Sequence, residues 1–327
     1  MPELVDKPAD TGSDGLFTVV AGEGDGVMLG LAAGDSAGGA WELGYSAVTE
    51  QATLLAYGLI VSRSLRPDDL ISALLEMDGA QEEEPVLRAV SPELRVWLDG
   101  ARSGAALPGD EPSLDAAARA TVLGVAHRRD PDRLIADSMA LGRVFHLDAG
   151  TVVSGVMASA AVAASCFGQS GLDLVAGVGE SVSAALAGVS GLRDAERMGD
   201  LEARVVGLLP AVGVTTADEA LERAGGDHDD PVQMVLAGIL LAAPVAHRHH
   251  IAIEQAARIG GSRLGSIVGA IVGARVGIRA WPWAFANDTW FAEIGRRLVR
   301  GPDEVRDLPI PYAVEQHLMS GGRPGFH

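Results

Sequence analysis

The stretch that decides the fold runs from Asp25 to Gly39 and reads DGVMLGLAAGDSAGG. Its glycines at 26, 30, 34 and 38 recur every four residues, which places them on one face of a helix. The same spacing returns at 261–277, in GSRLGSIVGAIVGARVG. Because glycine inside a helix costs up to about 1 kcal/mol relative to alanine, such rows indicate close contact with another backbone. We therefore predict two central helices that pack tightly against other helices of a bundle.

Helical patterns also fill the chain between these two rows. We predict helices at 52–64, 67–77, 114–128, 131–145, 151–167, 172–190, 201–209, 216–224, 231–247 and 251–258. Convincing strand patterns, with alternating apolar and polar residues, are absent. The sequence thus predicts an all-α fold, a compact multi-helix bundle, with residues 1–24 as a flexible tail and residues 25–327 as a single domain. The uncharged stretch 149–172 is rich in Ala, Ser and Gly, so we expect a buried helix there and no membrane span.

Composition narrows the classes of function. Hydrophobic residues make up 48% of the 327 residues, which is typical of a globular protein. The formal net charge of −19 argues against binding to nucleic acid or to anionic membranes, since both need a basic surface. The single cysteine, Cys166, excludes an internal disulfide and a thiolate zinc site. With no signal peptide in the first 24 residues, we expect an acidic, soluble, cytoplasmic protein.

Several short motifs resemble nucleotide-binding or metal-binding sites but are weak evidence for them. The glycines between 30 and 39 follow no strand, so a dinucleotide-binding turn is not expected. The cluster His247-Arg248-His249-His250 consists of adjacent residues, whose side chains point in different directions on a helix and do not easily share one metal. The loop 225–231 could hold a divalent cation through its acids and His228. Asp230 directly before Pro231 is more typical of a helix cap.

The first glycine row and the residues after it resemble a known family. Residues 26–42 fit the pattern Gly-x-x-x-Gly-x-x-x-Gly-Asp-x-x-Gly-x-x-x-Glu, which includes Asp35 and ends at Glu42. This pattern is similar to the opening of the ADP-ribosylglycohydrolase family. Thr49-Glu50-Gln51 falls where the family has Thr-Asp-Asp, segment 116–124 resembles its Gly-Ala-Met-Arg helix, and His146 falls on its Thr-His pair. Segment 259–269 falls on the family's Asp-x-Asp motif. In all, the resemblance covers about residues 25–283.

The resemblance implies a changed metal site. Members of the family hold two Mg²⁺ or Mn²⁺ ions between the Thr-Asp-Asp and Asp-x-Asp motifs, and hydrolyse the bond between ADP-ribose and a modified side chain. In this chain Glu50 and Gln51 stand at the first two Asp positions, and Gly260 and Ser262 stand at the other two. Hard dications need several carboxylate oxygens, so we expect no binuclear metal centre and no other cofactor.

The remaining residues are expected to bind a ligand. The first hypothesis is a ligand-binding or regulatory pseudoenzyme that recognises ADP-ribose or a related nucleotide, with Arg263 pointing into the former metal cleft. An alternative is a hydrolase of N- or O-glycosidic bonds that works without metal, with Glu42 or Glu50 as general base. A second alternative is a structural protein, because the family includes a lens crystallin. The candidate ligand-binding residues are Asp35, Thr49, Gln51, His146, Ser262, Arg263, Trp281 and Trp283.

Overall fold

The computed structural model describes most of the chain. The described residues are 13–39, 44–79, 87, 90–105, 108–167, 170–214, 216–244, 249–277, 286–300 and 308–319, with the backbone alone for 13–23 and 319. Within them the chain is almost entirely helical, and the β pairings are isolated bridges such as the one between Gly109 and His146. The all-α fold class is therefore confirmed.

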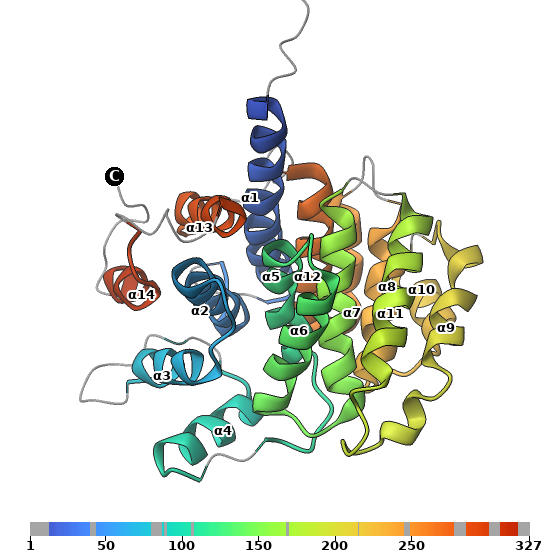
Figure 1. Ribbon diagram of the computed structural model, residues 1–327, viewed down its shortest axis with the longest axis horizontal. Helices are drawn as coiled ribbons and strands as arrows, with labels where there is room; N and C mark the ends of the chain where they lie inside the picture. The colour runs from blue at the N-terminus through green and yellow to red at the C-terminus, as the bar shows by residue number, and fades with distance from the viewer. Residues whose placement is uncertain are drawn as a thin grey trace, which may run out of the picture.

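Helices follow one another through short connections (Figure 1). Their bounds are α1 Ser13–Ala37, α2 Ala47–Ser62, α3 Pro67–Met77, α4 Pro92–Arg102, α5 Asp115–Ala126, α6 Pro131–Phe145, α7 Ala149–Ser165, α8 Gly171–Leu186, α9 Leu201–Gly207, α10 Ala217–Ala224, α11 Pro231–Ala242, α12 His249–Val276, α13 Asp288–Arg300 and α14 Pro311–Met319. Two 3₁₀ helices, η1 Ala195–Met198 and η2 Leu209–Ala211, flank α9. Sequence reasoning missed α4, α13 and α14. Helix α1 begins at Ser13, so it includes part of the segment 1–24 that was expected to be a flexible tail. The assignment of residues 25–327 to a single domain stays a prediction.

Helices α1 and α12 pack side by side through the middle of the molecule, as the glycine rows predicted (Figure 1). A Cβ atom added at Gly34 would overlap the carbonyl oxygen of Gly265, and one added at Gly269 would overlap that of Gly30. Gly26 meets Gly273 in the same way. The two backbones therefore touch along several turns, a separation that no larger residue permits.

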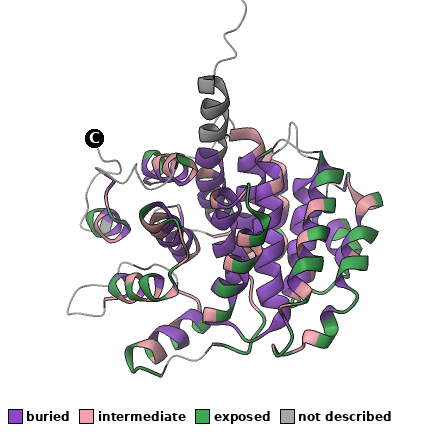
Figure 2. Ribbon diagram, in the orientation of Figure 1, coloured by how far each residue is buried: buried purple, intermediate pink, exposed green. Residues whose placement is uncertain are grey.

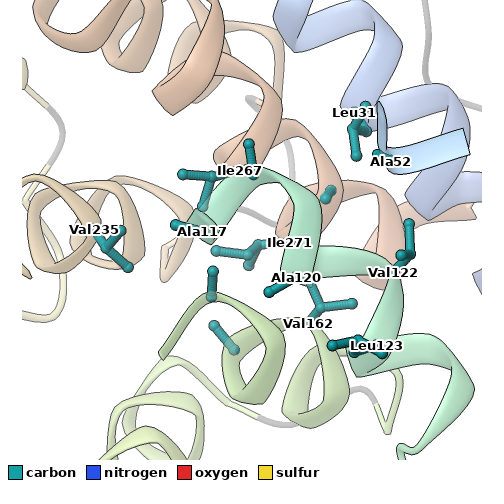
Figure 3. Close-up of a cluster of buried hydrophobic side chains, with 14 of the residues drawn as sticks. Leu31, Ala52, Ala117, Ala120, Val122, Leu123, Val162, Val235, Ile267 and Ile271 are labelled. Carbon is teal, nitrogen blue, oxygen red and sulfur yellow. The ribbon is translucent and has the colours of Figure 1, made fainter. Parts of the chain in front are cut away.

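A layer of helices that are buried on nearly every side lies next to this pair. Helix α7 covers most of the uncharged stretch 149–172, and almost all of its residues are buried, as the purple ribbon in Figure 2 shows. Side chains from α1, α2, α5, α7, α11 and α12 meet in one core, where Ala117, Ala120 and Ile271 lie close together (Figure 3). No described helix is long and apolar enough to cross a membrane.

Helix α12 contains a break that shapes the candidate site. Gly261 has φ 58° and ψ −153°, a conformation outside the helical region that glycine adopts at little cost. The helix therefore restarts at Ser262, whose hydroxyl donates a hydrogen bond to the carbonyl oxygen of Asp35 at 3.2 Å. This break turns Gly260 and Arg263 toward the first turns of α5 and α11, with which they line one cavity.

Candidate ligand-binding site

Asp35 ties the end of α1 to the start of α2. Its buried carboxylate accepts hydrogen bonds from the backbone N–H and the hydroxyl of Ser46, each at 2.8 Å, and from the hydroxyl of Thr49 at 2.8 Å. Burial raises the pKa of Asp35, although these hydrogen bonds oppose the rise. Asp35 and Thr49, both predicted to touch a ligand, thus contact each other, and Ser262 joins them through the Asp35 carbonyl.

Glu50 and Gln51 lie in the first turn of α2 and are almost fully buried, with 1% and 3% of their surface exposed. The side-chain amide of Gln51 donates to the carbonyl oxygen of Ala47 at 3.0 Å, while its Oε1 is buried without a hydrogen-bond partner. At Gly260, an added Cβ would crowd the side chains of Leu264 and Met234. Position 260 therefore has little space for a carboxylate.

Arg263 is held by acidic side chains. Its Nε donates a short hydrogen bond to the carboxylate of Asp115, and its Nη2 lies 3.8 Å from the carboxylate of Glu93. Burial raises the pKa of Asp115, but the charges of Arg263 and Arg119 outweigh it, so the pKa stays below its ordinary value. The ion pair links α12 to α5. The positive charge of Arg263 is thus already balanced inside the protein.

A polar cavity of about 570 Å³ lies beside this ion pair. Leu114 and Ser113 border it at the start of α5, Pro231 at the start of α11, and Gly260 with Arg263 at the break of α12. We call it the kink cavity. Exposed acidic residues, Glu93, Glu111 and Asp229, also line it. The adjoining loop confirms the cap interpretation, because the carboxylate of Asp230 accepts the backbone N–H of Val232 at 2.8 Å.

A second cavity, of about 360 Å³, is lined by Asp115 and adjoins the kink cavity, with which it shares Glu93 and Glu111. Its walls include Trp97, Phe145, His146 and Arg119, and we call it the aromatic cavity. Arg119 is 2% exposed, and its guanidinium carbon lies 3.8 Å from the centre of the Phe145 ring. Its Nη2 lies 3.3 Å from Nε2 of His146. Burial, together with the charge of Arg119, lowers the pKa of His146 to about 3.

The predicted site residues therefore fall into two groups. Asp35, Thr49 and Ser262 meet at the junction of α1, α2 and α12, whereas His146 and Arg263 contact Arg119 and Asp115, which lie one turn apart on the same face of α5. The predicted residues Glu42, Trp281 and Trp283 lie outside the described residues, as do His247 and Arg248 of the histidine cluster.

Sequence reasoning singled out neither Asp115 nor Arg119 as site residues. Both belong to the alanine-rich segment of α5, which is buried on all sides. Charged residues in such an apolar helix are rarely buried without a partner, so they could have indicated a site.

Among the described residues, no group of three or more His, Cys, Asp or Glu side chains is placed to hold a metal ion. At the four positions that the resemblance in sequence matches to metal-binding aspartates, Glu50 is the one acidic residue. A binuclear Mg²⁺ or Mn²⁺ centre needs several shared carboxylates, so the residues at these positions do not fit one.

Comparisons with known proteins agree with this fold. A sequence model of the ADP-ribosylglycohydrolase family matches residues 24–307. The structure is similar to that of an ADP-ribosylglycohydrolase-related protein complex, with a TM-score of 0.56 and 20% identity over 86% of this chain and 99% of that one. None of the curated proteins compared with the chain matches it significantly. With a match that spans most of its length, the chain belongs to the ADP-ribosylglycohydrolase family.

Proposed function

We propose that this family member binds ADP-ribose or a related nucleotide in the kink cavity, without a binuclear metal centre, and acts as a regulatory or ligand-binding pseudoenzyme. Membership in the family supports the class of ligand. The loss of carboxylates supports the absence of the metals. Gln51 is neutral, Ser262 offers only a hydroxyl, and the crowding of Gly260 by Leu264 leaves no room for a carboxylate there.

The observation that carries the proposal is the pair of helix starts that border the kink cavity. Helix α5 begins after Leu114, whose side chain makes no cap hydrogen bond, although the hydroxyl of Ser113 accepts the first N–H of the helix, that of Asp115, at 3.1 Å. The second half of α12 begins directly after Gly261. Such helix ends carry partial positive charge and bind phosphate groups. They can attract a pyrophosphate even though Asp115 balances the charge of Arg263.

The test uses the start of α5. In Leu114→Asp a carboxylate stands at the helix N-terminus, where it caps the helix and occupies the place of the ligand's phosphate. Titration calorimetry with ADP-ribose in EDTA should show binding to the wild type and a loss of about tenfold or more in the variant. Thr216→Asp is the matched control, because Thr216 caps α10 without a side-chain hydrogen bond and lies away from the cavity.

Two results would contradict the proposal. Equal affinity of wild type and Leu114→Asp would show that the α5 terminus does not hold the phosphates. Release of ADP-ribose from ADP-ribosylated arginine or serine peptides in EDTA would show a metal-independent hydrolase instead. Sulfate at matched ionic strength controls for general anion binding.

A further inference from the structure

The wall of the aromatic cavity contains a buried positive charge, that of Arg119, which has no carboxylate in direct contact within the described part of the chain. Among the described residues around the first turn of α5, the buried guanidinium of Arg119 and the half-buried one of Arg263 face a single buried carboxylate, that of Asp115. Asp115 gives its close contact to Arg263, whereas Arg119 reaches only the backbone carbonyl of Asp115, with its Nε at 3.1 Å. The exposed Glu93 lies 3.8 Å from Nη2 of Arg263 and also borders the aromatic cavity. Arg119 therefore shares Asp115 with Arg263 and has, among these described residues, no carboxylate of its own in hydrogen-bond contact.

Arg119 also has an unused donor. Its Nε and Nη2 have the partners described above, but its Nη1 is buried without any hydrogen-bond partner. His146 cannot supply a negative charge. Because a guanidinium only donates, Nε2 of His146 must accept, and the imidazole is neutral with its proton on Nδ1. A buried charged donor left unpaired is costly, so an acceptor that carries negative charge would be stabilised beside it.

The rest of the cavity indicates what else the ligand carries. Its walls are mainly apolar, with Leu94, Trp97 and Phe145 among them, and Val96, which is 73% exposed, borders it. About 360 Å³ is room for a small organic molecule. The exposed acids Glu93, Asp110 and Glu111 also border the cavity, so the favourable place for a ligand's negative charge is beside Arg119.

We infer that the aromatic cavity binds a small carboxylic acid with an apolar or aromatic body, whose carboxylate accepts a hydrogen bond from Nη1 of Arg119. One negative charge balances the one unpaired guanidinium, and the apolar body contacts the Trp97 side of the cavity. The inference does not rest on nucleotide binding in the kink cavity: the two cavities share Glu93 and Glu111, but Arg119, Trp97 and Phe145 line the aromatic cavity and not the kink cavity.

Titration calorimetry with 3-phenylpropionate, hexanoate and their uncharged amides tests the inference on the full chain. The acids should bind at least about tenfold more tightly than the amides, because a charged hydrogen bond is lost in each amide. Arg119→Met, which keeps much of the side-chain volume, should abolish this preference. Equal binding of acid and amide, no binding of either acid at millimolar concentration, or an unchanged preference in Arg119→Met would each overturn it.

A second pair of variants avoids the core, in case Arg119→Met does not fold. Val96 is exposed at the cavity, so Val96→Lys should strengthen binding of 3-phenylpropionate and Val96→Glu should weaken it, each by about threefold. Val206, 51% exposed on α9, is the matched control, and Val206→Lys or Val206→Glu should change nothing. Identical affinities for Val96→Lys and Val96→Glu would place the carboxylate elsewhere and overturn the inference.

Discussion

Replacing His146 with glutamine should reduce the fall in the free energy of unfolding that accompanies a fall in pH below 6.5. His146 is 5% exposed, and its folded-state pKa of about 3 is far below the ordinary value of 6.5. Between these values the unfolded chain binds a proton on this residue and the folded chain does not. The free energy of unfolding therefore falls as the pH falls from 6.5 toward 3.

The magnitude follows from the width of this interval. Between pH 6.5 and pH 5, an interval of 1.5 pH units, the unfolded state binds a proton that the folded state does not. Each pH unit of this interval lowers the free energy of unfolding by about 1.4 kcal/mol. His146 alone should thus remove about 2 kcal/mol of stability by pH 5, whatever its exact folded-state value below that pH. The glutamine of His146→Gln does not titrate and keeps an acceptor for Arg119, so the variant should be spared this loss.

Urea unfolding at intervals from pH 7.5 to 5, followed by circular dichroism, measures the effect as the difference between wild type and variant. His228→Asn provides the control, since that side chain is exposed, and it should follow the wild type at every pH. If the His146→Gln and wild-type stabilities stay parallel down to pH 5, then His146 is not held neutral by burial. The description of the inner wall of the aromatic cavity would then be wrong.

Three further changes have defined outcomes. Gly34→Ala should lower the free energy of unfolding by several kcal/mol in urea, because the added Cβ meets the α12 backbone. Gly58 has open space around it, so Gly58→Ala should raise the free energy of unfolding by about 0.5–1 kcal/mol. Similar values for both variants would refute the close contact. Arg263→Ala should cost about 2–3 kcal/mol, because the buried Asp115 loses its ion-pair hydrogen bond, whereas the surface change Arg258→Ala should cost under about 1 kcal/mol. A negligible cost for Arg263→Ala would show that this ion pair does not stabilise the fold. Millimolar Mg²⁺, Mn²⁺ or EDTA should leave the melting temperature unchanged, and a rise of several degrees with either ion would reveal a metal site.

The helix pairing could be predicted from sequence because glycine rows carry positional information. A row at every fourth residue specifies a face that packs closely, whereas the register, with Gly26 against Gly273 and Gly34 against Gly265, is known only from the structure. Helix α4 escaped prediction because it is short, with Leu94, Trp97 and Leu98 as its buried residues, too few for a clear period.

The side-chain contacts of the site could not be predicted in the same way. Arg263 and Asp115 are 148 residues apart, and nothing in either local pattern specifies which carboxylate the arginine meets. The sequence did separate a helix at 251–258 from the glycine row that begins at 261, and the break at Gly261 lies at this boundary. Resemblance identified the family from motifs along the chain, but only the fold shows that Asp35 caps α2 and that Arg119 lines the aromatic cavity.

The pairing of α1 with α12 affects how the protein is made. Helix α1 ends at Ala37, but its partner α12 is complete only when Val276 has been synthesised. At about 5–20 residues per second, the ribosome needs roughly 10–50 seconds to add the intervening chain. During that time the glycine face of α1 has no helix to cover it, and a nascent chain in this state is a substrate for chaperones. Folding of the central helix pair is therefore limited by synthesis of the C-terminal part, and a ribosome that stalls before α12 leaves a chain unable to complete its core.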